Sequence, residues 1–138
     1  MARERILLDT VYIQGLLSSA DQYHAAAVAA LPRVEKAEEI FITEAVITEV
    51  CNALAAINRK AAMRFVRGCE ANPKITVVHV DAELFARSLS LYENRSDKAW
   101  SLTDCISFTV MQDRNVVLAA TGDHHFEQAG FRAILSQR

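Results

Sequence analysis

The stretch "EIFITEAVITEVCNALAAIN", residues 39–58, contains two apolar patterns, one directly after the other. Its first part, "EIFIT" at 39–43, is a short run of aromatic and β-branched side chains, which is typical of a buried strand. From residue 44 onward the apolar side chains recur at helical spacing instead, at Val46, Ile47, Val50, Cys51, Leu54 and Ile57. The stretch therefore predicts a strand that leads straight into a helix.

The same alternation runs through the rest of the chain. Further strands are predicted at "RILL" (5–8), "KITVVHV" (74–80), "NVVLAAT" (115–121) and "FRAIL" (131–135). Further helices are predicted at 23–34, helical at least as far as Leu31, and at 59–70, 81–94 (with Asp81 as N-cap) and 101–114. Apolar strands that alternate with helices predict an α/β sandwich with a mainly parallel sheet.

Composition and length fit a single domain that spans residues 1–138, with 51% apolar and 23% charged residues. The formal net charge of −2 gives no overall basic field for nucleic acid or membrane, so any such partner needs a local patch. Cys51, Cys69 and Cys105 are odd in number and lack C-x-x-C spacing, which disfavours a disulfide framework or a zinc site. Without a signal peptide or an apolar stretch long enough to cross a bilayer, we expect a cytoplasmic protein with no membrane partner.

Acidic residues occur where the predicted strands end. Asp9 follows the strand at 5–8, and Asp123 follows the strand at 115–121 and the turn residue Gly122. Asp104 lies in the first turn of a helix expected to begin at the same edge of the sheet, and Glu49 lies on the flank of an apolar helix face, beside small residues. Ligands of parallel sheets bind outside the carboxyl ends of the strands, so these acids are candidates for a site.

Each acid also has a purely structural interpretation. Asp9 fits a turn, Asp123 an N-cap and Glu49 a solvated helix residue, while "SLTD" at 101–104 matches a capping box that would use Asp104. Taken singly, the structural interpretation is preferred for each acid. The recurrence of an acid at successive strand-to-helix transitions on one edge favours a shared site.

A cluster of carboxylates would need a cation, because converging carboxylates repel one another and raise each other's pKa. Oxygen ligands without histidine or cysteine at metal spacing suit Mg²⁺ or Mn²⁺. These ions activate water and stabilise the leaving oxygen in reactions of phosphate esters. The residues therefore indicate a metal-dependent phosphodiesterase with a nucleic acid as substrate.

Four short motifs resemble, in order and spacing, those of the PIN-domain ribonucleases, and within them the VapC-type toxins of toxin–antitoxin pairs. They are "LLDT" (7–10), "TEAVITEV" (43–50), "WSLTDCISFTVM" (100–111) and "TGDHHFEQAGF" (121–131). The resemblance implies a three-layer α/β/α sandwich and a homodimer that cleaves RNA endonucleolytically and is blocked by a small antitoxin. It also implies that Mg²⁺ or Mn²⁺ is held by the catalytic acids Asp9, Glu49, Asp104 and Asp123. One departure is Val11, where the family usually has Ser or Asn.

The residues beside the acids each have two alternative roles. Thr10 and Thr121 would orient carboxylates or serve as caps and turns. His124 and His125 are assigned to the surface or to a helix start, with a general acid as the alternative.

Two other functions are alternatives to the nuclease. A haloacid-dehalogenase-like phosphatase needs a second Asp two residues after the first, and Val11 occupies that position. A PIN-like module that binds RNA or protein without cutting is the other alternative, which the presence of all four acids disfavours.

Overall fold

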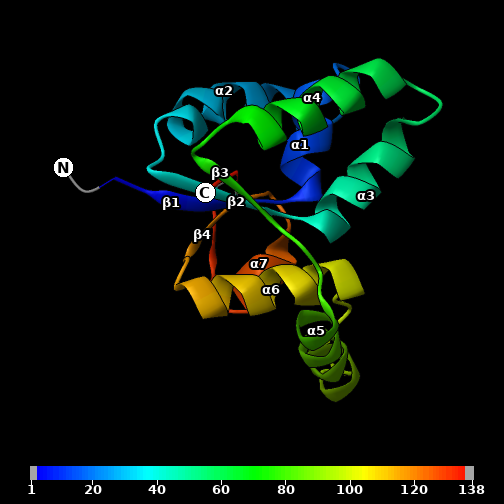
Figure 1. Ribbon diagram of the computed structural model, residues 1–138, viewed down its shortest axis with the longest axis vertical. Helices are drawn as coiled ribbons and strands as arrows, with labels where there is room; N and C mark the ends of the chain where they lie inside the picture. The colour runs from blue at the N-terminus through cyan, green and yellow to red at the C-terminus, as the bar shows by residue number, and fades with distance from the viewer. Residues whose placement is uncertain (1–2, 136–138) are drawn as a thin grey trace.

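A parallel sheet forms the centre of the computed structural model, which describes residues 3–135 (Figure 1). Within that range the sheet has five strands in the order β3-β2-β1-β4-β5, and every neighbouring pair is parallel. The strands are β1 (Arg5–Leu8), β2 (Glu39–Thr43), β3 (Ile75–Val78), β4 (Leu118–Ala120) and β5 (Arg132–Ala133). Because β1 is central, the residue that follows it lies between the ends of two other strands.

Helices cover both faces of this sheet, which gives the three layers of an α/β/α sandwich (Figure 1). One face carries α1 (Thr10–Leu17), α2 (His24–Glu35) and α4 (Arg59–Ala71), with α3 (Glu44–Leu54) extending from the end of β2 against α1. The other face carries α5 (Ala82–Asn94), α6 (Leu102–Arg114) and α7 (His124–Gln128). The predicted fold class is confirmed.

Each face of the sheet has its own apolar core. On the α1 side the fully buried side chains include Tyr12, Ile13 and Val50. On the α6 side the ring of Phe108 makes an edge-to-face contact with Phe126, at 4.9 Å between centroids. Parallel strands buried on both faces need such continuous apolar sequence, which is why their residues show no alternation with polar ones.

The register of the sheet fixes what lies next to the first acid. Leu8 of β1 pairs with Ala120 of β4, and the backbone N–H of Asp9 donates to the carbonyl oxygen of Ala120 at 3.2 Å. Asp9 therefore lies beside Thr121, the residue that follows β4. Sequence positions more than a hundred residues apart thus meet at the carboxyl edge.

The strands and helices differ from the predicted bounds at several ends. β3 pairs only with β2, and this pairing stops at Thr43↔Val78, where β2 ends, so residues 79–80 lie outside the strand. The helix predicted over 44–58 ends at Leu54, and Ile57 lies in a turn with 73% of its surface exposed. Helix α2 continues past Leu31 through Pro32 to Glu35.

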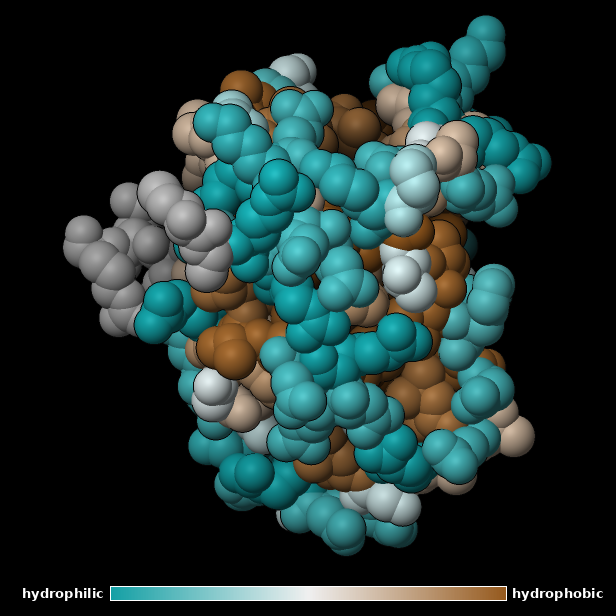
Figure 2. All heavy atoms as spheres, turned by 60° about the vertical axis from the view of Figure 1, so that its left-hand side comes forward, coloured by the Kyte–Doolittle hydropathy of each residue, from teal (hydrophilic) through white to brown (hydrophobic). Residues whose placement is uncertain are grey.

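The surface is mainly polar on the face drawn in Figure 2, where apolar residues reach the surface in separate areas. Among the helices of residues 3–135, none combines the length and apolar character needed to cross a membrane.

Candidate active site

Asp9 occupies the centre of the carboxyl edge. It follows β1 directly, and only 3% of its surface is exposed. Its Oδ2 accepts a hydrogen bond of 2.7 Å from the hydroxyl of Thr121, and the same hydroxyl oxygen accepts one from the backbone N–H of Asp123. Thr121 therefore connects Asp9, which follows β1, with Asp123, the N-cap of α7.

Asp104 reaches the same edge from the start of α6. Ser101 is the N-cap, and the predicted capping box is present: the Ser101 hydroxyl accepts from the Asp104 N–H, and Asp104 Oδ2 accepts from the Ser101 N–H. The same Oδ2 lies 3.0 Å from Nδ1 of His125. The capping box thus holds the carboxylate at the helix N-terminus, where backbone N–H groups and the helix dipole favour an anion.

Asp123 caps α7 and faces the other two acids. Its Oδ1 accepts a hydrogen bond of 2.9 Å from the backbone N–H of His125, so the N-cap interpretation of this residue is correct. The negative charges of Asp104 and Asp123 act on Asp9, and that of Asp123 acts on Asp104, which places the three carboxylates within one electrostatic cluster.

Glu49 is attached to this cluster through a neighbour of Asp9. It projects half-buried from α3, and its Oε1 accepts a hydrogen bond of 2.7 Å from the hydroxyl of Thr10. The structure therefore links Asp9 to Asp123 through Thr121 and Asp104 to Asp123 through His125, and it joins Glu49 to Thr10, the neighbour of Asp9. The catalytic and metal-binding roles of all four stay predictions.

The electrostatics of the cluster favour the addition of positive charge. Burial, together with the negative charges of Asp104 and Asp123, raises the pKa of Asp9 to about 7, although a hydrogen bond from Thr121 opposes this rise. Burial also raises the pKa of Asp104, although its bonds from Ser101 and His125 oppose this. Within residues 3–135 the arginine salt bridges use other acids: Glu4, Glu39, Glu70, Glu83, Asp97 and Asp113.

The donor set fits a hard divalent cation. Three carboxylates from β1, α6 and α7, with Glu49 nearby, offer the oxygen ligands that Mg²⁺ and Mn²⁺ prefer. Within residues 3–135, the group of acidic and histidine side chains whose donor atoms all lie within 4.8 Å of one another is Asp123, His124 and His125, with the side chain of His124 71% exposed. A cavity of about 330 Å³ is lined by Glu49, Thr103 and Phe85 among others, and Asp9, Asp104 and Asp123 are not part of its lining.

His125 lies in the first turn of α7, as the helix-start interpretation of the sequence predicts, but the surface interpretation is wrong because its side chain is only 19% exposed. The sequence does not predict that its ring lies between two of the acids. The available signal was its place two residues after an N-capping Asp, which brings its backbone N–H to that carboxylate.

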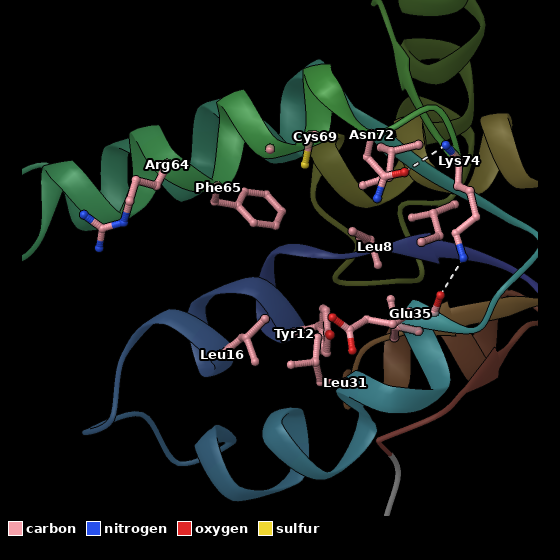
Figure 3. A pocket seen from close by; sticks show the side chains of 14 residues that line it. Leu8, Tyr12, Leu16, Leu31, Glu35, Arg64, Phe65, Cys69, Asn72 and Lys74 are labelled. Atoms are coloured by element: carbon pink, nitrogen blue, oxygen red, sulfur yellow. Dashed lines mark hydrogen bonds between the residues drawn. The ribbon is translucent and has the colours of Figure 1, made fainter.

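A second cavity, of about 480 Å³, lies between α4 and the pair α1 and α2 (Figure 3). Phe65 points into it from α4, and Tyr12 and Leu31 face it from the opposite side. Lys74 Nζ donates to the carbonyl oxygen of Glu35 at one end, as the dashed line in Figure 3 shows. None of the four acids lines this cavity, so it is separate from the carboxylate cluster.

The PIN domain family model matches residues 6–132, so the chain belongs to the PIN domain family. Comparison with curated proteins gives no match. Among solved structures, the chain is similar to VapC20 of Mycobacterium tuberculosis, described as a sarcin–ricin loop cleaving toxin, with a TM-score of 0.81 and 23% identity over 91% of this chain and 95% of that one.

Two structures of Fit proteins are also similar. FitAcB from Neisseria gonorrhoeae gives a TM-score of 0.62 and 21% identity, covering 93% of this chain and 95% of that chain. FitAB bound to the IR36 DNA fragment gives a TM-score of 0.64 and 18% identity, covering 96% of this chain and 97% of that chain. At these identities the three structures establish the shared fold.

Proposed function

We propose that the protein is a metal-dependent endoribonuclease and the toxin component of a toxin–antitoxin pair. The observation that carries this proposal is the convergence of Asp9, Asp104 and Asp123 at the carboxyl edge, with no arginine or lysine salt bridge to them within residues 3–135. Membership of the PIN domain family supports nuclease chemistry for such a cluster.

In this mechanism Asp9, Glu49, Asp104 and Asp123 would hold Mg²⁺ or Mn²⁺. The ion, when bound, supplies a Lewis acid that activates water and stabilises charge on the phosphodiester. Thr121 orients the Asp9 carboxylate, the Ser101 capping box orients Asp104, and the Thr10 hydroxyl orients Glu49. These bonds hold the carboxylates in place before substrate arrives, which lowers the cost of reorganisation during the reaction.

The biological setting is proposed from the relatives. VapC20 is described as a toxin that cleaves the sarcin–ricin loop, and FitAB was solved on DNA. By analogy we propose RNA as the substrate of this chain, a small antitoxin protein as its partner, a homodimer as its assembly and the cytoplasm as its location. Residues 1–138 would act as one nuclease domain.

The test is cleavage of a generic RNA with Mn²⁺ or Mg²⁺, repeated with EDTA. We expect Asp104→Asn to lower metal-dependent cleavage by about 100-fold or more, because the variant loses a charged ligand. Asp113→Asn is the matched control, since Asp113 lies on the same helix but pairs with Arg87 at 2.7 Å. Equal cleavage by Asp104→Asn and the parent would refute the role given to Asp104.

Two alternative functions are a PIN-like module that binds without cutting and a phosphatase. The same assay distinguishes the PIN-like module from a nuclease, because such a module would bind RNA and leave it intact. The haloacid-dehalogenase-like phosphatase is not proposed, since the chain belongs to the PIN domain family.

A further inference from the structure

We infer that His125 is a positioning residue, which holds the carboxylates of Asp104 and Asp123 together as one half of the divalent-cation site. The inference rests on the proposed function. These two acids belong to different helices, α6 and α7, so neither helix alone determines the distance between them. A side chain that contacts both carboxylates constrains this distance in addition to the packing of α7 on α6.

The geometry shows that His125 contacts both acids. Its Nδ1 lies 3.0 Å from Asp104 Oδ2 and 3.4 Å from Asp123 Oδ1, while its backbone N–H donates to Asp123 Oδ1 at 2.9 Å. Both neighbours of Nδ1 are carboxylate oxygens, so Nδ1 carries the proton that is shared with them. The residue thus binds Asp123 through its backbone and Asp104 through its ring.

The ring of His125 is held in this position by its surroundings. The next residue, Phe126, is fully buried and packs on Phe108 of α6, which fastens α7 to α6. The side chain of His125 is only 19% exposed. Its position is therefore set by the packing of two helices.

The contacts also determine which oxygens face a cation. The hydrogen bonds to Ser101 and His125 use Oδ2 of Asp104, and those to His125 use Oδ1 of Asp123. We assign the other oxygen of each carboxylate, Asp104 Oδ1 and Asp123 Oδ2, to the cation. A donor that occupies one oxygen fixes the rotation of the carboxylate, as partners of metal ligands commonly do.

The experiment measures Mn²⁺ binding without RNA, by calorimetric titration and by the melting temperature as a function of Mn²⁺ concentration. We expect His125→Ala to weaken Mn²⁺ binding by about 10–100-fold. His125→Asn should restore most of the affinity, because the amide nitrogen of Asn can occupy the place of Nδ1 and donate to Asp104. His79→Ala is the matched control: it removes another imidazole that contacts a carboxylate, Glu44 Oε2 at 2.9 Å, outside the cluster.

Each result supports or overturns the inference. Parental affinity in His125→Ala would overturn the role of His125 alone, whereas a parent chain that binds no Mn²⁺ would overturn the proposed metal site as well. His125→Asn as weak as His125→Ala would show that a hydrogen-bond donor is not what matters. Nitrogen coupling to Mn²⁺ in the electron spin-echo spectrum of the parent that persists in His124→Ala and disappears in His125→Ala would make His125 a ligand and refute its positioning role.

Discussion

At the scale of single residues, the candidate acids serve two purposes at once. Asp104 closes the capping box of α6 and Asp123 caps α7, yet both face Asp9. This is why sequence reasoning left two interpretations open for each. The structural interpretation and the proposed functional one describe the same carboxylates, so the first does not weaken the second.

Asp9 is expected to destabilise the metal-free protein. Its pKa is about 7 in the folded state and about 3.9 in unfolded chains, so the folded protein binds the proton more tightly. Stability from this group is present below about pH 4 and is lost as the pH rises towards 7. Asp9→Asn should therefore raise the free energy of unfolding at pH 8 in EDTA by up to about 4 kcal/mol.

Urea unfolding at pH 5 and pH 8 checks this expectation, because the variant should lose the part of the pH dependence that Asp9 causes. Asp113→Asn is a control of opposite sign. The hydrogen bond from Arg87 lowers the pKa of Asp113, so that carboxylate stabilises the fold above its unfolded pKa and its removal should lower stability. A parent as stable as Asp9→Asn at pH 8 would contradict the account of Asp9.

At the scale of elements, the turn between β4 and α7 determines where Asp123 lies. Gly122 fills the position between Thr121 and Asp123, and a Cβ there would lie 2.3 Å from Cε1 of Tyr23, which precedes α2. The turn and the start of α2 are therefore in close contact. Only glycine allows this approach without displacement of the ring or the turn.

Gly122→Ala should lower the free energy of unfolding by about 1–3 kcal/mol through overpacking. It should also weaken Mn²⁺ binding, since Asp123 follows the turn directly. Thermal unfolding of a double-mutant cycle with Tyr23→Ala measures the coupling. If the two substitutions have additive effects, the predicted clash does not exist.

At the scale of the whole molecule, the layers could be predicted from sequence because most of the parallel strands are short apolar runs followed by a helical pattern, although the sequence pattern does not predict α1 after β1. The carboxyl-edge placement of Asp9 and Asp123 followed from the same rule. The role of His125 could not be predicted, because it depends on how α7 packs on α6 through Phe126 and Phe108. Strand ends such as that of β3 also depend on the partner strand, which a local pattern does not contain.

The cavity between α1, α2 and α4 is also formed by segments that lie far apart in the sequence. The hydroxyl of Tyr12 is buried there with no hydrogen-bond partner among the described residues. Tyr12→Phe should raise the free energy of unfolding by about 1 kcal/mol, since burial of an unpaired hydroxyl is unfavourable. Urea unfolding compares it with Tyr92→Phe, whose ring is 49% exposed and whose change should have little effect. A less stable Tyr12→Phe variant would show that the hydroxyl is paired.

The hydrogen bond between Thr121 and Asp9 joins residues separated by 112 positions in the chain. During translation Asp9 leaves the ribosome long before its partner Thr121 and before Asp123. A nascent polypeptide therefore carries the first acid without the others and completes the carboxylate cluster only once β4 and α7 have been made. The order of synthesis thus delays the assembly of the site until α7 has left the ribosome.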